Sequence, residues 1–113
     1  MKGVPLLLLS TAGARSGKAI TKPLAYTRDG DRIVVIASFA GSPHHPTWYI
    51  NLLKNPVVTV QMGNEKFQAR AITTSGELRQ RLFDAQSKLP PVFAEYQKKT
   101  SRAIPVVILE RAN

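Results

Sequence analysis

Segments in which apolar, often β-branched residues alternate with polar ones recur along this chain of 113 residues. A period of two is typical of strands that bury one face. Asp29-Gly30-Asp31 and Gly63-Asn64 separate neighbouring segments with tight-turn sequences, which favours hairpins. The pattern predicts about six strands, at Val4–Ser10, Ile20–Arg28, Arg32–Ser38, Val57–Met62, Glu65–Thr73 and Ile104–Glu110.

Three other segments show the spacing of helices. The first is Pro46–Lys54, which ends at Asn55-Pro56 because a residue that precedes a proline disfavours the helical conformation. The second runs from Gly76 to about Lys88, and a short third one spans Pro91–Thr100. Strands with helices inserted between hairpins predict a mainly β fold, a small β-barrel. The chain is long enough for one domain, over residues 1–113, with its own core.

The second helix has a recognisable start and a predicted buried face. Ser75 can cap its first turn. The predicted apolar face consists of Leu78, Leu82 and Ala85. Arg79 and Arg81 fall outside this series, so we expect both on the solvated face.

The composition is that of an ordinary soluble protein, with 43% hydrophobic and 20% charged residues. The absence of cysteine excludes disulfides, thiolate chemistry and cysteine metal sites. The apolar run Val4–Leu9 is too short for the core of a signal peptide and for a membrane span. We therefore expect a soluble cytoplasmic protein.

The charge is less ordinary, since the formal net charge is +9. Five cationic residues precede the first acidic residue, Asp29: Lys2, Arg15, Lys18, Lys22 and Arg28. Such a bias favours an anionic partner. A basic helix or interleaved aromatic residues, which nucleic-acid binding proteins usually show, are not found in the sequence. A phosphorylated or polycarboxylate ligand is therefore favoured over nucleic acid.

The segment Thr11–Lys18 carries the equipment for holding such a ligand. Its two glycines allow backbone amides to approach an anion, while Arg15 offers a bidentate fork and Lys18 a mobile charge. The alternative is an ordinary polar hairpin turn, and this segment alone supports both equally. A Walker phosphate loop is excluded, because only three residues separate Gly13 from Gly17 and Ala19 follows the lysine.

Several blocks in a fixed order resemble the deazaflavin-dependent nitroreductase family, whose members are actinobacterial split β-barrels that use coenzyme F420. These blocks are Thr11–Gly17, Pro23-Leu24, Asp29–Ser38, His45–Pro56 and Arg102–Val107. The W-Y-x-N-L-x-x-N-P block is the most specific of them. The resemblance implies an FMN-binding-like split barrel and an F420H2-dependent reductase.

The resemblance also implies which residues form the site. The cofactor carries a phosphodiester and an oligoglutamate tail, which suits a basic pocket mouth. The positions matched to cofactor contacts are Gly13, Arg15, Ser16, Gly17, Lys18, Lys22, Pro23, Leu24, Ala37, Ser38, Thr47, Trp48, Tyr49 and Asn51. Ser38 and Tyr96 match positions on the substrate side and are the candidate catalytic residues. The implied reaction is hydride transfer to a small planar acceptor such as a quinone, nitroaromatic or enone.

Two rival functions remain on the same barrel. One is a protein that binds FMN, and the other is a non-catalytic F420 carrier. Family members generally pair, so the resemblance implies a homodimer, and a lipid quinone as substrate would bring peripheral membrane contact. The chain departs from better-known members at Ile20 and Phe39, where they carry basic residues.

Each candidate also has a structural interpretation. Trp48 and Tyr49 are adjacent, so one of them is expected to face the core, and core packing is favoured for Trp48. Asn51 and Asn55 could satisfy backbone groups at the helix end. Tyr26 and Phe67 are expected to pack on strands. His44 and His45 have no third ligand at suitable spacing, so no metal site is predicted.

Overall fold

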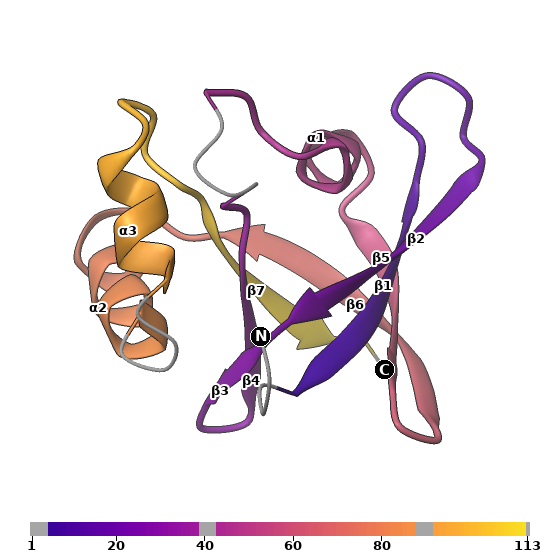
Figure 1. The fold of residues 1–113 in the computed structure, drawn as a ribbon. Coiled ribbons are helices and arrows are strands. Elements are labelled where there is room, and N and C mark those ends of the chain that lie inside the picture. Colours follow the sequence, from indigo (N-terminus) through magenta and orange to yellow (C-terminus); the bar gives the residue numbers. More distant parts are fainter. Residues whose placement is uncertain (1–4, 39–42, 88–91, 113) are drawn as a thin grey trace.

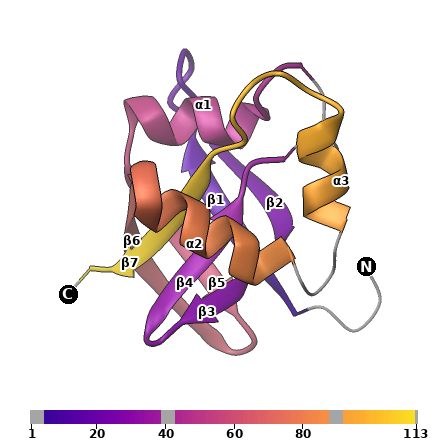
Figure 2. The same ribbon diagram turned by 90° about the vertical axis from the view of Figure 1, so that its left-hand side faces the viewer.

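The computed structural model describes residues 5–38, 43–87 and 92–112, which form seven strands and three helices. They are β1 (Leu6–Ala12), β2 (Ala19–Ala25), β3 (Thr27–Asp29), β4 (Arg32–Ile36), α1 (Thr47–Lys54), β5 (Val57–Met62), β6 (Glu65–Thr73), α2 (Gly76–Ser87), α3 (Val92–Lys98) and β7 (Val106–Arg111). The strands form one antiparallel sheet in the order β2-β1-β5-β6-β7-β4-β3. Figure 1 shows this sheet curled into a half-barrel with α1 across one end. In Figure 2, α2 and α3 lie together beside β4 and β7.

The prediction of six strands was wrong by one, because the second predicted strand is two strands. β2 pairs with β1, where Ala25 faces Leu6, whereas β3 pairs with β4, where Thr27 faces Val34. The chain changes partner at Tyr26, whose N–H donates to the carbonyl of Pro5 at 3.3 Å. As a result β2 and β3, which are consecutive in the chain, are the two outer strands of the sheet. At Tyr26 the chain therefore passes from one outer strand of the sheet to the other.

The other elements lie close to their predicted positions. β5 and β6 match the predicted ranges, while β1 begins two residues later than predicted and extends to Ala12. β4 ends at Ile36, two residues before the predicted end, and β7 begins at Val106, two residues after the predicted start, and ends one residue later than predicted. The predicted limits at Val4, Lys88 and Pro91 lie outside the described residues. No helix in the described ranges is long and apolar enough to cross a membrane.

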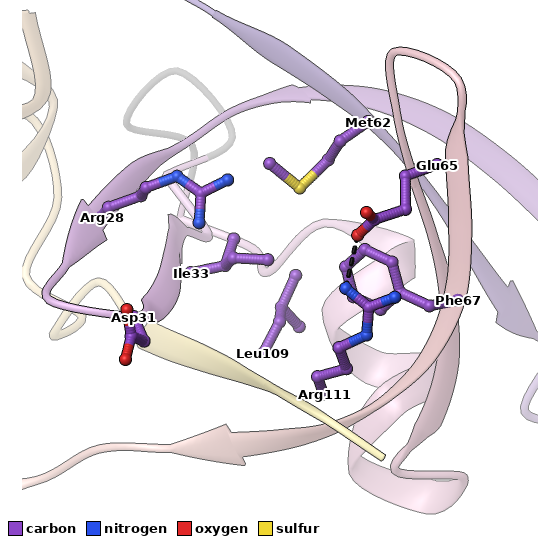
Figure 3. A pocket seen from close by; sticks show the side chains of 8 residues that line it. All are labelled: Arg28, Asp31, Ile33, Met62, Glu65, Phe67, Leu109 and Arg111. Atoms are coloured by element: carbon purple, nitrogen blue, oxygen red, sulfur yellow. Dashed lines mark hydrogen bonds and ion pairs between the residues drawn. The ribbon is translucent and has the colours of Figure 1, made fainter. Parts of the chain in front are cut away.

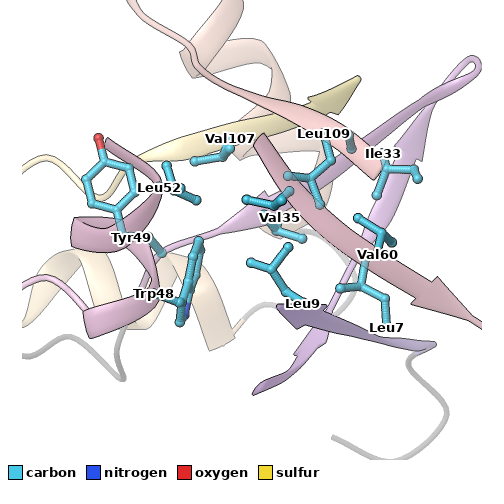
Figure 4. Close-up of a cluster of buried hydrophobic side chains, with 13 residues drawn as sticks. Leu7, Leu9, Ile33, Val35, Trp48, Tyr49, Leu52, Val60, Val107 and Leu109 are labelled. Atoms are coloured by element: carbon cyan, nitrogen blue, oxygen red, sulfur yellow. The ribbon is translucent and has the colours of Figure 1, made fainter. Parts of the chain in front are cut away.

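One hydrophobic cluster, here called the inner cluster, fills the space between the sheet and α1. Alternate residues of the strands supply it, together with the buried side of α1 (Figure 4). Its buried members are Leu7, Leu9, Ile33, Val35, Ala37, Trp48, Tyr49, Leu52, Val58, Val60, Ala69, Val107 and Leu109. Tyr26 and Phe67 pack against it, which confirms their expected role. Because burial of each large aliphatic side chain contributes about 1.5–3 kcal/mol, this cluster stabilises the sheet and holds α1 against it.

A second hydrophobic cluster, the outer cluster, lies on the opposite side of β4 and β7. It consists of Val34, Ile36, Leu82, Phe83, Ile104, Val106 and Ile108, with Tyr96 packed against it. On α2, Leu82 is buried as predicted, but Leu78 and Ala85 are exposed and Phe83 takes the second buried position. Arg79 lies one turn before this pair, on the same side of the helix, so the prediction that it is solvated was wrong. Arg81 is exposed as predicted and pairs with Asp29 at 3.0 Å.

Candidate functional site

The turn between β1 and β2 depends on its two glycines. The N–H of Gly13 donates to the carbonyl of Lys18 at 2.8 Å, and the N–H of Gly17 donates to the carbonyl of Gly13 at 2.9 Å. Gly17 has φ +73°, a conformation that side chains disfavour. A Cβ at Gly13 would lie 2.8 Å from Oγ of Ser16. Glycine is thus favoured at both positions, by its φ at Gly17 and by the close approach of Ser16 at Gly13, and the turn leaves Arg15, Ser16 and Lys18 exposed.

The cations of this turn have no acidic partner among the residues that the structure describes. Among the described residues, no carboxylate lies within ion-pair distance of Arg15, Lys18 or Lys22. Within the described residues, the backbone N–H groups of Arg15 and Ser16 donate to no acceptor. Positive side chains and open amides together suit a phosphate or carboxylate group. The donor set therefore fits the anionic part of the cofactor that the sequence implied.

Asn51 connects this turn to α1. Its side chain is 2% exposed, and its Oδ1 accepts the N–H of Ala14 at 3.0 Å. Its Nδ2 donates to Oγ1 of Thr11 at 3.1 Å. The structural interpretation of Asn51 thus accounts for both halves of its amide, while a contact to a cofactor stays a prediction. At Asn55 the backbone N–H donates to the carbonyl of Asn51 at 2.8 Å, and a capping role for its side chain stays a prediction.

Four residues matched to the cofactor ring meet in the inner cluster. Leu24 of β2, Ala37 after β4, and Trp48 and Tyr49 of α1 all pack there. The core-packing interpretation of Trp48 is correct, and Tyr49 is buried as well. The two rings are 6.3 Å apart, edge to face, and the hydroxyl of Tyr49 lies 3.4 Å from Oγ1 of Thr73. Residues from three separated segments therefore form one apolar wall.

Other matched residues lie on exposed positions around this wall. Lys22 and Pro23 are exposed on β2, an outer strand of the sheet, where a proline is tolerated. Thr47 is exposed at the first residue of α1. Of the two departures from the family, Ile20 is half-buried on β2, and Phe39 lies outside the described residues.

The end of β4 is held by a guanidinium group from a distant segment. Nη2 of Arg102 donates to the carbonyl of Ser38 at 2.7 Å, and Nη1 donates to the carbonyl of Ala37 at 3.2 Å. Nη1 also lies 3.1 Å from Nδ1 of His45, just before α1. Burial, and then the positive charge of Arg102, lower the pKa of His45. Ser38 itself is buried, at 8% exposure.

The two candidate catalytic residues lie in different surroundings. Ser38 follows β4 directly, whereas Tyr96 of α3 packs against the outer cluster, with the ammonium of Lys99 5.8 Å from its ring centre. Their catalytic roles remain predictions.

A network built around Arg79, Gln97 and Arg102 was not predicted from the sequence. Arg79 donates to the carbonyl of Ile104 at 2.6 Å and to Oε1 of Gln97 at 3.1 Å, and its guanidinium lies 4.5 Å from the ring centre of Phe83. Burial lowers the pKa of both Arg79 and Arg102. One signal was available, since Arg79 stands three and four residues before Leu82 and Phe83 and so shares their side of the helix.

Of the hollows lined by described residues, two touch the predicted site residues. A hollow of about 350 Å³ between α1 and α2 is lined by Tyr49, His45 and Arg79 among others. One of about 180 Å³ beside the β1–β2 turn includes Gly17. A third, of about 190 Å³, opens at the end of the half-barrel away from α1, with Arg28 pointing into it (Figure 3). None of the matched residues lines this third hollow.

The chain is similar to proteins of known type over nearly its whole length. A family model described as F420H(2)-dependent quinone reductase matches residues 1–111. The F420H(2)-dependent quinone reductase Rv1261c of Mycobacterium tuberculosis is 38% identical over 110 residues, which are 95% of this chain and 74% of that protein. A solved structure of an F420-H2 dependent reductase (FDR-A) has 39% identity and TM-score 0.85 over 94% of each chain. Another, a domain-swapped dimer, has the same identity and TM-score over 94% of this chain and 80% of its own. These likenesses confirm the split-barrel fold and the resemblance found in the sequence.

Proposed function

The chain belongs to the F420H(2)-dependent quinone reductase family, and from this premise we propose that it is an enzyme that reduces quinones with coenzyme F420 as cofactor. When bound, the reduced cofactor supplies the hydride. The observation that carries the proposal is the arrangement of two unlike surfaces. A cationic turn, which has no acidic partner in the described ranges, is tied through Asn51 to a wall of buried apolar side chains.

In this proposal the turn holds the anionic part of the cofactor. Arg15 and Lys18 supply charge that no carboxylate of the described chain neutralises. The net charge of +9 favours a ligand with several negative groups over one with a single phosphate. This difference supports F420, with its glutamate tail, over FMN.

The apolar wall has a different task, which is to orient a flat ring and to exclude water. Leu24, which is half-buried, has carbon surface left to offer it, while the buried Ala37 and Trp48 support that surface from within the inner cluster. A dry surface strengthens the electrostatic interactions that develop during hydride transfer. The hydroxyl of Ser38 is the proposed donor to the acceptor oxygen, where negative charge grows as the quinone is reduced. Tyr96, which packs against the outer cluster, is proposed for the substrate side on the family resemblance alone.

We further propose that the protein works as a homodimer in the cytoplasm. The similar structure described as a domain-swapped dimer supports pairing. Exposed leucines on β1, Leu6 at 58% and Leu8 at 41%, supply apolar surface that a partner could cover. Membrane contact is proposed only for the case of a lipid quinone as substrate.

A spectral titration with oxidised F420 and with FMN, followed by turnover with menadione, tests the function. We expect micromolar or tighter F420 binding, weaker FMN binding, and affinity for F420 that falls as salt is added because exposed charges are screened. We also expect F420H2 to be oxidised faster when menadione is present. Equal affinity for both cofactors would remove the electrostatic argument. Tight F420 binding without reduction of any quinone, nitroaromatic or enone would identify a carrier instead.

A further inference from the structure

Arg102 joins two segments that the site needs at a fixed distance. It lies between α3 and β7, yet its guanidinium reaches the end of β4, where it donates to the carbonyls of Ala37 and Ser38 at 3.2 and 2.7 Å. The same group lies 3.1 Å from Nδ1 of His45, two residues before α1 begins. One side chain therefore contacts both ends of the connection between β4 and α1.

The contact with His45 defines the state of that ring. Because a guanidinium only donates, Nδ1 of His45 must accept, which places the ring proton on Nε2. Burial and the charge of Arg102 both lower the pKa of His45, so they favour this neutral form. The other groups around the ring are Tyr49, with ring centres 5.0 Å apart, and Arg79, which lines the same hollow. The residues that line this hollow include no carboxylate that could offset Arg102.

Arg102 is itself held in place by the helices of the outer layer. Nε2 of Gln97 donates to the carbonyl of Arg102 at 2.8 Å. Oε1 of Gln97 accepts the N–H of Ile104 at 2.9 Å and Nη2 of Arg79 at 3.1 Å. The backbone of Arg102 is thus fixed to α3 through Gln97, which is itself bonded to Arg79 of α2. Its guanidinium therefore reaches the end of β4 from a fixed position.

We propose that Arg102 is a positioning residue, which holds the end of β4 against the start of α1 so that Ala37 and Ser38 keep their place beside Trp48 and Tyr49. This inference rests on the proposed function, because those four residues are the ones matched to the cofactor ring and the substrate. Arginine suits the task, since its rigid fork serves three acceptors at once. A lysine ammonium, a single point of charge, cannot span all three.

The test compares Arg102→Met, which keeps much of the side-chain volume without donors, with Arg102→Lys and the wild type. In Arg102→Met the contacts to Ala37, Ser38 and His45 are lost. If only about a tenth of the molecules then keep the end of β4 in its place against α1, the apparent Kd for F420 rises about tenfold. Turnover at saturating F420H2 should stay within about twofold, because bound cofactor selects the same arrangement. Arg102→Lys should fall between the other two. Arg111→Met, an arginine at the far end of β7, is the matched control and should change neither value.

A second measurement does not depend on the cofactor. NMR titration of the two histidines, assigned with His44→Gln, should show the pKa of His45 below its ordinary value in the wild type. Arg102→Met should raise it towards that value, whereas Arg111→Met should leave it unchanged. His45→Asn, which keeps an acceptor near the position of Nδ1, should retain F420 affinity better than His45→Gln.

The two measurements separate the possible failures. If the wild type binds no F420, the proposed function is wrong, and the titration of His45 still decides whether the contact exists in solution. If the wild type binds F420 but folded Arg102→Met binds it within twofold of wild type, the positioning role is wrong. An unchanged pKa of His45 in that variant would contradict the contact itself. Should Arg102→Met fail to fold, Arg102→Lys and the pair of His45 variants decide in the same way.

Discussion

The two ends of the half-barrel use polar side chains in opposite ways. At the end that α1 covers, Asn51 and Arg102 are wholly or partly buried, and their polar atoms bond to backbone and side-chain groups of other segments. At the far end, near the β3–β4 turn and the β5–β6 hairpin, the polar side chains form exposed ion pairs. These pairs are Arg32–Asp29, Arg81–Asp29 and Arg111–Glu65.

This difference decides what each end can contribute. A hydrogen bond between buried groups fixes geometry, and its loss strands a polar atom away from water. An exposed ion pair exchanges contacts with water and counterions at little net gain. The α1 end, where most residues of the proposed site gather, should therefore be the more sensitive to substitution.

The largest effect is expected for Asn51→Ala. This change leaves the N–H of Ala14 and the hydroxyl of Thr11 without their partner. The hydroxyl of Thr11 is buried and the N–H of Ala14 is half-buried. Because stranding a buried group costs about 1–3 kcal/mol, we expect a loss of roughly 2–4 kcal/mol in the free energy of unfolding. Urea denaturation followed by tryptophan fluorescence measures it, since the single Trp48 lies in the same helix.

The matched control for Asn51→Ala is Gln61→Ala. Gln61 is an exposed amide on β5. We expect a change within about 0.5 kcal/mol, as is usual for surface positions. Equal losses in both variants would mean that the two ends do not differ in the way proposed.

An intermediate effect is expected when charge is removed from the β1–β2 turn. Arg15→Ala and Lys18→Ala should each weaken F420 binding about tenfold or more, because a charge-assisted contact is worth roughly 1.5–3 kcal/mol. Thermal unfolding should be little changed, since both side chains are exposed. Arg28→Ala is the control, an exposed arginine at the far end that also has no ion pair in the described chain. If Arg28→Ala weakens binding as much, the effect comes from net charge and the turn is no specific site.

What the sequence could predict follows from how local each signal is. The β5–β6 hairpin was predicted residue by residue because its turn, Gly63-Asn64, lies within the segment itself. The division at Tyr26 could not be predicted, because it depends on β1 and β4, which are distant in the chain and pair with different halves of that segment. Arg79 was misplaced since the apolar series on α2 was started from Leu78 and omitted Phe83.

In the candidate site, too, only the features with a local signal in the sequence could be predicted. The glycines, cations and aromatic residues were found from the sequence because their residue types suggest chemistry on their own. The bonds of Arg102 to Ala37 and Ser38 join residues more than sixty positions apart, and no local pattern marks them. For Asn51 the sequence offered a binding and a structural interpretation, and only the fold showed that both halves of its amide are already bonded.

The smallest effect is expected for the ion pair at the far end. Glu65 and Arg111 are in hydrogen-bond contact, but both side chains are more than half exposed. Arg111 also lies over the ring of Phe67, 4.2 Å from its centre, and Glu65→Gln leaves that stacking in place. We therefore expect this variant to lose no more than about 1 kcal/mol in the free energy of unfolding, and less at high salt, where exposed charges are screened. Urea denaturation in low and high salt measures both. A loss above 2 kcal/mol that salt does not reduce would show that this end is also held by a specific bond, and the contrast between the two ends would fail.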